Sequence, residues 1–241
     1  MTRKLIQFKA LTMDCYGTLI DWESGIWDAL QPLLHFNSRR DITRRVALEA
    51  YATIESLQQA ETPEMIYPEI LQNVHMTFAR RFNLKTKPEL NEAFGNSVPH
   101  WPAFPDAADA LRQLQQHFKL VIISNIDNES FAASNKKLGV TFDAIYTAQD
   151  MGAYKPTAAN FDYMLNRLEA DLNILPGDIL HTAQSLFHDH VPAKNIGLTC
   201  VWIDRQNLSA SENWGATARV DQRPEVNFTF PTMQALADAL D

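Results

Sequence analysis

Residues 10–19 read ALTMDCYGTL, an apolar run that stops at Asp14 and is soon followed by a glycine. A short apolar run that ends at a polar turn is typical of a strand buried on both faces of a sheet. Gly17 lets the backbone turn sharply just beyond the strand, and Thr18 can hydrogen-bond to the Asp14 carboxylate. The pattern predicts a strand over residues 10–13 with Asp14 at its carboxyl end.

Further short apolar runs follow along the chain, with helical patterns between them. The helical patterns cover residues 107–118 and 160–172, and the strand-like runs cover residues 120–123, 144–147, 179–182 and 199–203. Strands that alternate with helices favour right-handed crossovers and a parallel sheet covered on both faces. We therefore predict an α/β protein with a parallel, Rossmann-like core sheet flanked by helices.

Residues 22–102 interrupt this alternation, because they show helical patterns only, including 42–59 and 64–82. We interpret them as a helical cap inserted into a core formed by residues 1–21 and 103–241. A single mixed α/β domain with a long helical excursion is the alternative. Both interpretations place the helices over the ends of the strands.

Composition and charge exclude several classes of protein. The chain has 241 residues, with 29 acidic and 21 basic side chains and a net charge of -8, which disfavours a nucleic-acid or anionic membrane surface. No apolar stretch approaches the ~18 residues of a membrane span, and the N-terminus lacks a signal-peptide pattern. Cys15 and Cys200 lack metal-ligand spacing and suit a reducing compartment. We expect a cytoplasmic protein without nucleic-acid or membrane partners.

Polar residues follow the ends of the predicted strands. Ser124 and Asn125 end the second strand, Lys155 precedes a proline after the third, and Asp189 follows the fourth. The carboxyl ends of parallel strands gather at one edge of a sheet, so these side chains and Asp14 should converge on one pocket.

Each of these groups has a chemical task. An ionised Asp14 can attack an electrophilic centre and form a covalent intermediate. Lys155 would favour the ionised form of Asp14 and offset the like charge of Asp189. Ser124 and Asn125 offer donors for a substrate carboxylate or an oxyanion. Taken singly, an aspartate can be a helix cap and a lysine a surface residue, but their joint order favours a catalytic site.

The motifs DCYGTLIDW, ISN, YKP and SLFHD resemble the four motifs of the haloacid dehalogenase superfamily and span nearly the whole core. The resemblance implies that Asp14 is the nucleophile, that Lys155 pairs with it, and that Asp189 positions or activates water, with Thr18 as a further catalytic residue. The residues expected to bind the substrate are Cys15, Tyr16, Trp22, Ser124 and Asn125.

Two departures distinguish this chain from the magnesium phosphatases of that superfamily. Phosphatases usually carry a second aspartate two residues after the nucleophile, where this chain has Tyr16. They also usually carry Gly-Asp before the final acid, where this chain has Ala183 and Gln184. Magnesium prefers anionic oxygens, so an amide is a poorer ligand. Tyr16 resembles the second type of 2-haloacid dehalogenase, which implies neither a metal nor another cofactor.

The resemblance also implies a mechanism. Asp14 would attack carbon 2 of a small 2-substituted carboxylic acid and expel the substituent. Water would then hydrolyse the ester at the carbonyl of Asp14 and release a 2-hydroxy acid of inverted configuration.

The leaving group is the open point of this hypothesis. The arginine that cradles halide in dehalogenases aligns near Thr53, and the serine and asparagine of their last motif correspond to Gln184 and Leu186. SLFHDHVPA and DCYGTLIDWE are closer to the azetidine-2-carboxylate hydrolases, which expel a ring amine. An amine needs a proton in order to leave, and His188 and His190 are the candidate donors.

Two other functions are alternatives, a magnesium-dependent small-molecule phosphatase and an inactive module that binds an anion or a partner. The inactive module is disfavoured because Asp14, Lys155 and Asp189 are all present. The resemblance adds a homodimer as an expectation for the assembly.

Overall fold

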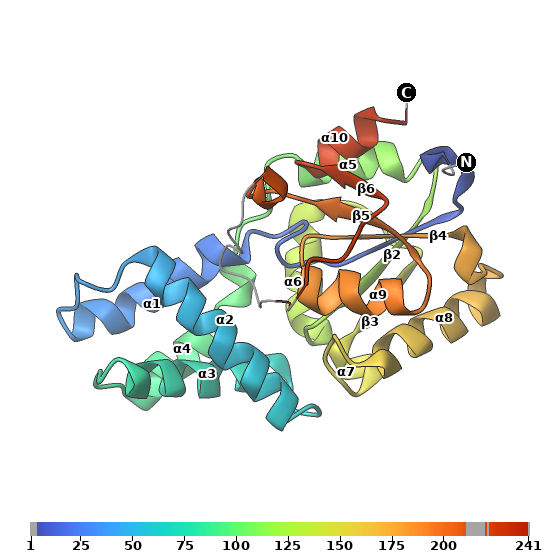
Figure 1. The fold of residues 1–241 in the computed structure, drawn as a ribbon. Coiled ribbons are helices and arrows are strands. Elements are labelled where there is room, and N and C mark those ends of the chain that lie inside the picture. Colours follow the sequence, from blue (N-terminus) through green and yellow to red (C-terminus); the bar gives the residue numbers. More distant parts are fainter. Residues whose placement is uncertain (1–3, 211–219, 221, 241) are drawn as a thin grey trace.

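The computed structural model describes residues 4–210, 220 and 222–240. Within this part of the chain one sheet of six parallel strands forms the core, in the order β3-β2-β1-β4-β5-β6 (Figure 1). The strands are β1 (Ala10–Met13), β2 (Lys119–Ser124), β3 (Ala144–Thr147), β4 (Ile179–Ala183), β5 (Thr199–Ile203) and β6 (Phe228–Phe230). The predicted α/β fold with a parallel sheet is confirmed.

Strand β1 lies at the point where the strand order reverses. It pairs with β2 on one side, where Met13 lies opposite Ile122, and with β4 on the other, where Met13 lies opposite Thr182. In open parallel sheets such a switch point opens a crevice beyond the carboxyl ends of the strands. Asp14 follows β1 directly and therefore lies in this crevice.

Helices cover both faces of the sheet, and alternate residues of each strand are therefore buried on opposite sides. In β2, Leu120 and Ile122 pack in one hydrophobic cluster and Val121 and Ile123 in another. The first cluster includes residues of α5 (Ala107–Leu114), α6 (Asn128–Leu138) and α10 (Met233–Asp238), and the second includes residues of α8 (Ala158–Leu172) and α9 (Val191–Asn195). The short helix α7 (Ala148–Met151) follows β3.

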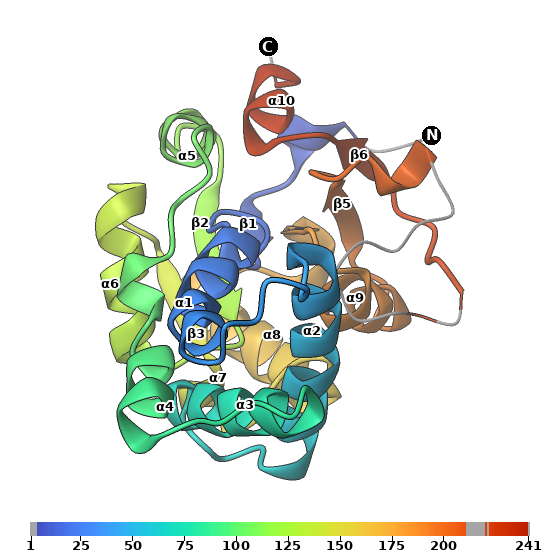
Figure 2. The same cartoon turned by 90° about the vertical axis from the view of Figure 1, so that its left-hand side faces the viewer.

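Four helices between β1 and α5 gather on one side of the core, away from both termini (Figures 1 and 2). They are α1 (Trp22–Phe36), α2 (Arg44–Glu61), α3 (Tyr67–Arg81) and α4 (Pro88–Gly95). We call these helices the cap. Side chains start the first two, because Asp21 accepts a hydrogen bond from the Ser24 main chain and Thr43 accepts one from that of Val46. The predicted helices over 42–59 and 64–82 correspond to α2 and α3, and the domain boundaries stay a prediction.

Two elements that follow β4 in the chain were not predicted from the sequence. Strand β6 extends the sheet with only three residues, too few to show a pattern. Residues Leu186–His190 form a π-helical turn, η4, where Ser185 accepts a hydrogen bond from the main chain of His188. An exposed loop is predicted over 206–223, of which 211–219 and 221 lie outside the described residues. None of the helices described here is long and apolar enough to cross a bilayer.

Candidate active site

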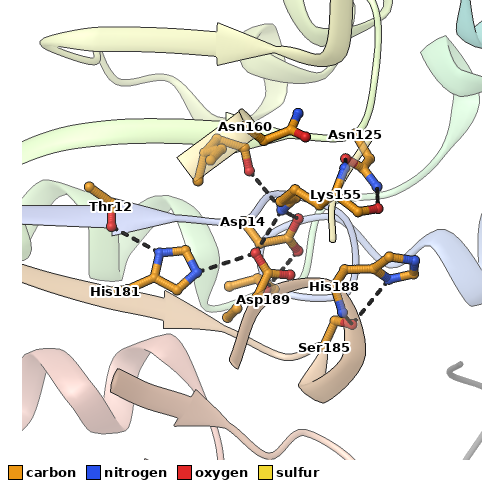
Figure 3. A network of polar contacts seen from close by, with 12 residues as sticks. Thr12, Asp14, Asn125, Lys155, Asn160, His181, Ser185, His188 and Asp189 are labelled. Atoms are coloured by element: carbon orange, nitrogen blue, oxygen red, sulfur yellow. Dashed lines mark hydrogen bonds and ion pairs between the residues drawn. The ribbon is translucent and has the colours of Figure 1, made fainter. Parts of the chain in front are cut away.

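Lys155 lies between two carboxylates at the crevice of the sheet (Figure 3). Its Nζ atom is 2.9 Å from Asp14 Oδ1 and 2.7 Å from Asp189 Oδ1, and it also donates to the main-chain oxygen of Ile123 at 2.9 Å. Asp14 follows β1, Lys155 follows α7, and Asp189 belongs to η4 after β4. The structure therefore brings together three residues that lie up to 175 positions apart, as the order of the strands predicts.

Burial makes the charges of this group depend on one another, since at most 6% of each residue is exposed. Burial, with a smaller contribution from the charge of Asp189, raises the pKa of Asp14, while the Lys155 ammonium opposes this rise. Burial also acts to raise the pKa of Asp189, but Lys155 and His181 outweigh it and hold that pKa well below its usual range. Burial alone would lower the pKa of Lys155, yet the two carboxylates raise it. The group is therefore a lysine ammonium held between two acids.

Thr18 fixes the second oxygen of Asp14. Its hydroxyl donates to Asp14 Oδ2 at 3.0 Å and accepts from the main-chain N–H of Gln184 at 2.9 Å. Gly17 makes this loop possible, because its φ of +96° is in a region that favours glycine, and a Cβ there would lie 3.0 Å from Gln184 Oε1. The loop after β1 is thereby tied to the loop after β4, and the orientation of Asp14 is set by both.

Ser124 and Asn125 occupy the end of β2, as predicted. Asn125 Nδ2 donates to the main-chain oxygen of Lys155 at 3.0 Å, and Asn125 Oδ1 accepts from the Lys155 main-chain N–H at 2.6 Å. Asn125 thus holds the loop that carries the lysine. The Ser124 hydroxyl is completely buried and has no hydrogen-bond partner among the described residues. A buried hydroxyl without a partner is costly, but Ser124 is not among the described residues that line the cavity.

A second line of contacts supports Asp189 from within the sheet. His181 Nε2 lies 3.3 Å from Asp189 Oδ1, and His181 Nδ1 lies 2.9 Å from the Thr12 hydroxyl (Figure 3). His181 and Thr12 were not predicted as site residues, because both occur inside apolar strand patterns. A polar side chain at the centre of a predicted buried strand was the signal that could have identified them.

The two histidines proposed as proton donors have different surroundings. His188 lines the cavity described below and contacts Ser185, with 3.2 Å between Nδ1 and Oγ. His190 is fully buried and donates from Nε2 to the main-chain oxygen of Ala183 at 2.9 Å. Burial lowers the pKa of each histidine to about 4, so both rings are neutral at pH 7. Only His188 is placed to meet a ligand.

A cavity of about 70 Å³ lies between Asp14 and the cap. The core side is formed by Asp14 and Lys155, by the loop after β1 and by the turn after β4, and the cap side is formed by helices α1 to α3. The lining residues are Asp14, Tyr16, Trp22, Tyr51, Ala52, Glu55, Ser56, Gln59, Tyr67, Asn125, Lys155, Gln184, Ser185 and His188. A site of this size fits a small organic molecule close to the Asp14 carboxylate.

The other predicted binding residues are distributed between this cavity and the core. Tyr16 and Trp22 line the cavity, and Tyr16 also hydrogen-bonds to Ser134, with 2.8 Å between the two hydroxyl oxygens. Cys15 is completely buried in the hydrophobic core, so its side chain is not at the cavity wall. Thr53 lies on the exposed face of α2 and donates to the main-chain oxygen of Glu49. No arginine occurs among the described residues that line the cavity.

The cap contributes polar groups that the sequence analysis did not single out. Tyr51, Glu55 and Gln59 of α2 and Tyr67 of α3 all line the cavity. The first three recur every fourth residue and so share one face of the helix. Polar residues repeated at this spacing beside apolar ones were the available signal, but an exposed helix face gives a similar pattern.

The described residues do not fit the magnesium ion that phosphatases of this fold use. No group of three histidine, cysteine, aspartate or glutamate side chains in the described part of the chain could hold a metal ion. Lys155 already binds one oxygen of Asp14 and one of Asp189, and Gln184 offers only a neutral amide. Magnesium needs several oxygen ligands in octahedral geometry, mostly anionic ones or water.

Comparisons with known proteins agree with this geometry. A family model described as haloacid dehalogenase-like hydrolase matches residues 8–181. A curated relative, (S)-2-haloacid dehalogenase 4A of Burkholderia cepacia, is 27% identical over 212 residues, which cover 82% of this chain and 84% of that protein.

Solved structures show the same fold over nearly the whole chain. The L-2-haloacid dehalogenase of Xanthobacter autotrophicus with chloropropionic acid covalently bound has a TM-score of 0.76 and 18% identity, covering 97% of this chain and 98% of that one. The HAD hydrolase YfnB of Bacillus subtilis, bound to magnesium, has a TM-score of 0.75 and 18% identity, covering 97% and 99%. A protein with covalently bound chloropropionic acid and one with bound magnesium thus share this architecture.

Proposed function

Because the chain belongs to the haloacid dehalogenase-like hydrolase family, we propose that it displaces the C2 substituent of a small 2-substituted carboxylic acid through an ester on Asp14. The observation that carries this proposal is the position of Lys155 between Asp14 and Asp189 beneath a small cavity. The family assignment confirms the resemblance drawn from the four sequence motifs. The C2 substituent would be a halide or the nitrogen of an azetidine ring.

Asp14 is suited to act as the nucleophile. Oδ1 is bound by Lys155 and Oδ2 by Thr18, so the carboxylate is held in a fixed orientation at the cavity wall. The ammonium of Lys155 favours the ionised form against the effect of burial. An oriented carboxylate in a site that excludes most water can attack carbon 2 and form the ester.

Asp189 is suited to the second step, the hydrolysis of that ester. Its charge is maintained by Lys155 and His181, which keep its pKa low. An anionic oxygen that contacts the same Lys155 ammonium as Asp14 can orient a water molecule for attack. The attacking oxygen then enters Asp14, and the alcohol leaves with the oxygen that Asp14 supplied.

Substrate recognition would use both walls of the cavity. Asn125, which lines the cavity, and Ser124, whose unpaired hydroxyl lies next to it in the sequence but does not line the cavity, are the proposed contacts of the substrate carboxylate. Tyr16 and Trp22 form an aromatic wall that limits the size of the C2 substituent. Cys15 could take part only through its main chain.

Oxygen-18 labelling tests the ester directly. Turnover in labelled water over many cycles, with 2-chloropropionate and azetidine-2-carboxylate as substrates, should place label in the peptide that contains Asp14. Turnover that leaves this peptide unlabelled would refute the mechanism. Asp14→Asn should abolish turnover without changing the thermal melting temperature by more than a few degrees.

Chelation separates this proposal from the magnesium phosphatase alternative. The proposed hydrolase should keep its full rate in excess EDTA and should not release phosphate from small phosphate esters. Phosphatase activity that disappears with EDTA and returns with magnesium would favour the alternative. An inactive binding module would form no adduct with any of these substrates.

A further inference from the structure

Glu55 places a carboxylate in the cap wall of the cavity, whose core wall contains Asp14 and Lys155. The hydroxyl of Tyr51 donates to Glu55 Oε1 at 2.8 Å, and the hydroxyl of Tyr67 donates to the same oxygen at 2.5 Å. Both bonds use one oxygen, so within the described part of the chain Oε2 is available to a bound molecule. The family mechanism assigns no task to this residue.

The tyrosines hold Glu55 in a fixed position but supply no positive charge. Tyr51 belongs to the same helix, Tyr67 to α3, and the two hydroxyl oxygens are 3.1 Å apart. Tyr154, which precedes Lys155, also feels the charge of Glu55, and its hydroxyl is engaged with the main-chain oxygen of Met65. Burial raises the pKa of Glu55, while the tyrosine hydroxyls oppose the rise. No cationic side chain among the described residues is paired with the Glu55 carboxylate, and a bound cation would supply that positive charge.

The charges around the cavity also favour a bound cation. The Asp14 and Asp189 carboxylates face the single ammonium of Lys155, and Glu55 is a third carboxyl group, in the wall of the same cavity as Asp14 and Lys155. His188 is the remaining basic side chain of the described lining and is neutral at pH 7, because burial lowers its pKa to about 4. A substrate carboxylate increases the negative charge, and displacement of a halide leaves the total unchanged because the charge of Asp14 passes to the halide. An ammonium substituent would lower the total by one. Like charges brought together in a partly dry site repel strongly.

We propose that Glu55 is a specificity-determining residue that selects substrates whose C2 substituent is a protonated amine. The proposal rests on the proposed C2 displacement and narrows its leaving group. The Glu55 carboxylate would accept a hydrogen bond from the ammonium N–H in Oε2, while the substrate carboxylate lies toward Ser124 and Asn125. A halide substituent lacks both the charge and the donor.

The reaction then balances with water as the only other reactant. Asp14 Oδ attacks carbon 2 as the C2–N bond breaks, and the bonding pair goes to the nitrogen, which leaves as a neutral primary amine. Water adds to the ester carbonyl of Asp14 and releases the 2-hydroxy acid, the Asp14 carboxylate and one proton. The amine takes up that proton. The net change is the addition of one water molecule to an azetidine-2-carboxylate-like ring.

Binding without turnover tests Glu55 separately from the ester mechanism. In Asp14→Asn, calorimetry would compare azetidine-2-carboxylate with cyclobutanecarboxylate, which has the same ring size but a carbon in place of the ammonium. We expect the ammonium compound to bind about 10- to 100-fold more tightly, as for a hydrogen bond between charged groups. The double variant Asp14→Asn/Glu55→Gln should bind both compounds equally.

The matched control is Glu49→Gln, which removes a carboxylate from the same helix at an exposed position paired with Arg45. This control in the Asp14→Asn background should leave the 10- to 100-fold difference unchanged. Glutamine at position 55 keeps an oxygen that can accept from Tyr51 and Tyr67, so the cap should remain folded. The comparison of the two compounds in Asp14→Asn alone leaves Glu55 unchanged, so its result does not depend on how the Glu55→Gln variant folds.

Turnover completes the test in the chain that retains Asp14. Glu55→Gln should lower kcat/KM for azetidine-2-carboxylate about 10- to 100-fold and should not lower it for 2-chloropropionate. Equal binding of the two ring compounds, or a preference that survives Glu55→Gln, would overturn the proposal for Glu55. Failure of oxygen-18 to enter Asp14 would instead overturn the ester mechanism, and the binding results would be unaffected by it.

Discussion

His181 lies directly behind Asp189, with 3.3 Å between Nε2 of the ring and Oδ1 of the carboxylate, and both residues are buried. The ring is fixed on its other side by Thr12, at 2.9 Å. Lys155 and His181 therefore both contact Oδ1 of Asp189. Under the proposed mechanism, His181 would hold this carboxylate in position for the hydrolysis of the ester.

His181→Phe should slow the second step more than the first. The pKa of Asp189 should rise without the ring, and Asp189 and Thr12 each lose a hydrogen bond, which costs about 1–3 kcal/mol of stability. Rapid quenching and mass analysis should show the Asp14 ester accumulating, with kcat lowered about 10-fold or more. His181→Gln, which keeps a donor, should restore part of kcat. Equal loss in both variants, without accumulated ester, would refute the positioning role.

Lys155→Met should leave two buried carboxylates without a cation. Removing one partner of a buried ion pair costs about 3–5 kcal/mol. The pKa values of Asp14 and Asp189 would then be higher in the folded than in the unfolded chain, so the folded state would bind more protons. Relative to the unmodified chain, the free energy of unfolding of Lys155→Met should therefore increase as the pH falls from 7 to 5. Denaturant titrations of both proteins at several pH values check this, and a difference that stays constant or grows over that range would contradict it.

His190 should make the unmodified chain less stable in mild acid. Burial lowers the pKa of His190 from 6.5 to about 4, so between these values the unfolded chain binds more protons than the folded one. The free energy of unfolding should therefore fall as the pH drops from 6.5 to 4, by about 3 kcal/mol from this residue. In His190→Gln this contribution should be absent. Parallel pH profiles of the two proteins would show that another group is responsible.

Gly17→Ala should impair both stability and activity. The φ of +96° disfavours a side chain, and the new Cβ would lie 3.0 Å from Gln184 Oε1 and 3.1 Å from Trp22 Nε1. We expect a loss of about 1–3 kcal/mol and a clear fall in kcat, because the loop orients Asp14. Gly139→Ala is the matched control, since φ there is +65° but nothing lies within 4 Å. It should cost about 1–2 kcal/mol and leave kcat unchanged.

The buried strands could be predicted closely because their residues repeat a simple pattern. The boundaries of β1, β3 and β5 agree with the apolar runs at 10–13, 144–147 and 199–203. Strand β6 could not be found in this way, because its three residues are only partly buried. Helix α5 ends at Leu114, four residues before the predicted end, although the apolar pattern continues to the buried Phe118.

The sequence alone determined that Asp14, Lys155 and Asp189 lie together. A polar residue that follows a buried parallel strand must lie at the carboxyl edge of the sheet, and this edge is common to all strands. Asp14, Lys155 and Asp189 could therefore be placed together without knowledge of any distance. Their order along the chain was sufficient.

Only the tertiary structure determined the cap wall of the cavity. Helical periodicity indicates which residues share a face of α2, but it does not indicate what that face meets. Thr53 was expected near the leaving group and is exposed, whereas Glu55, two residues later, lines the cavity with Tyr67 of another helix. A shift of two residues turns a helical side chain by about 200°, enough to exchange solvent for the active site.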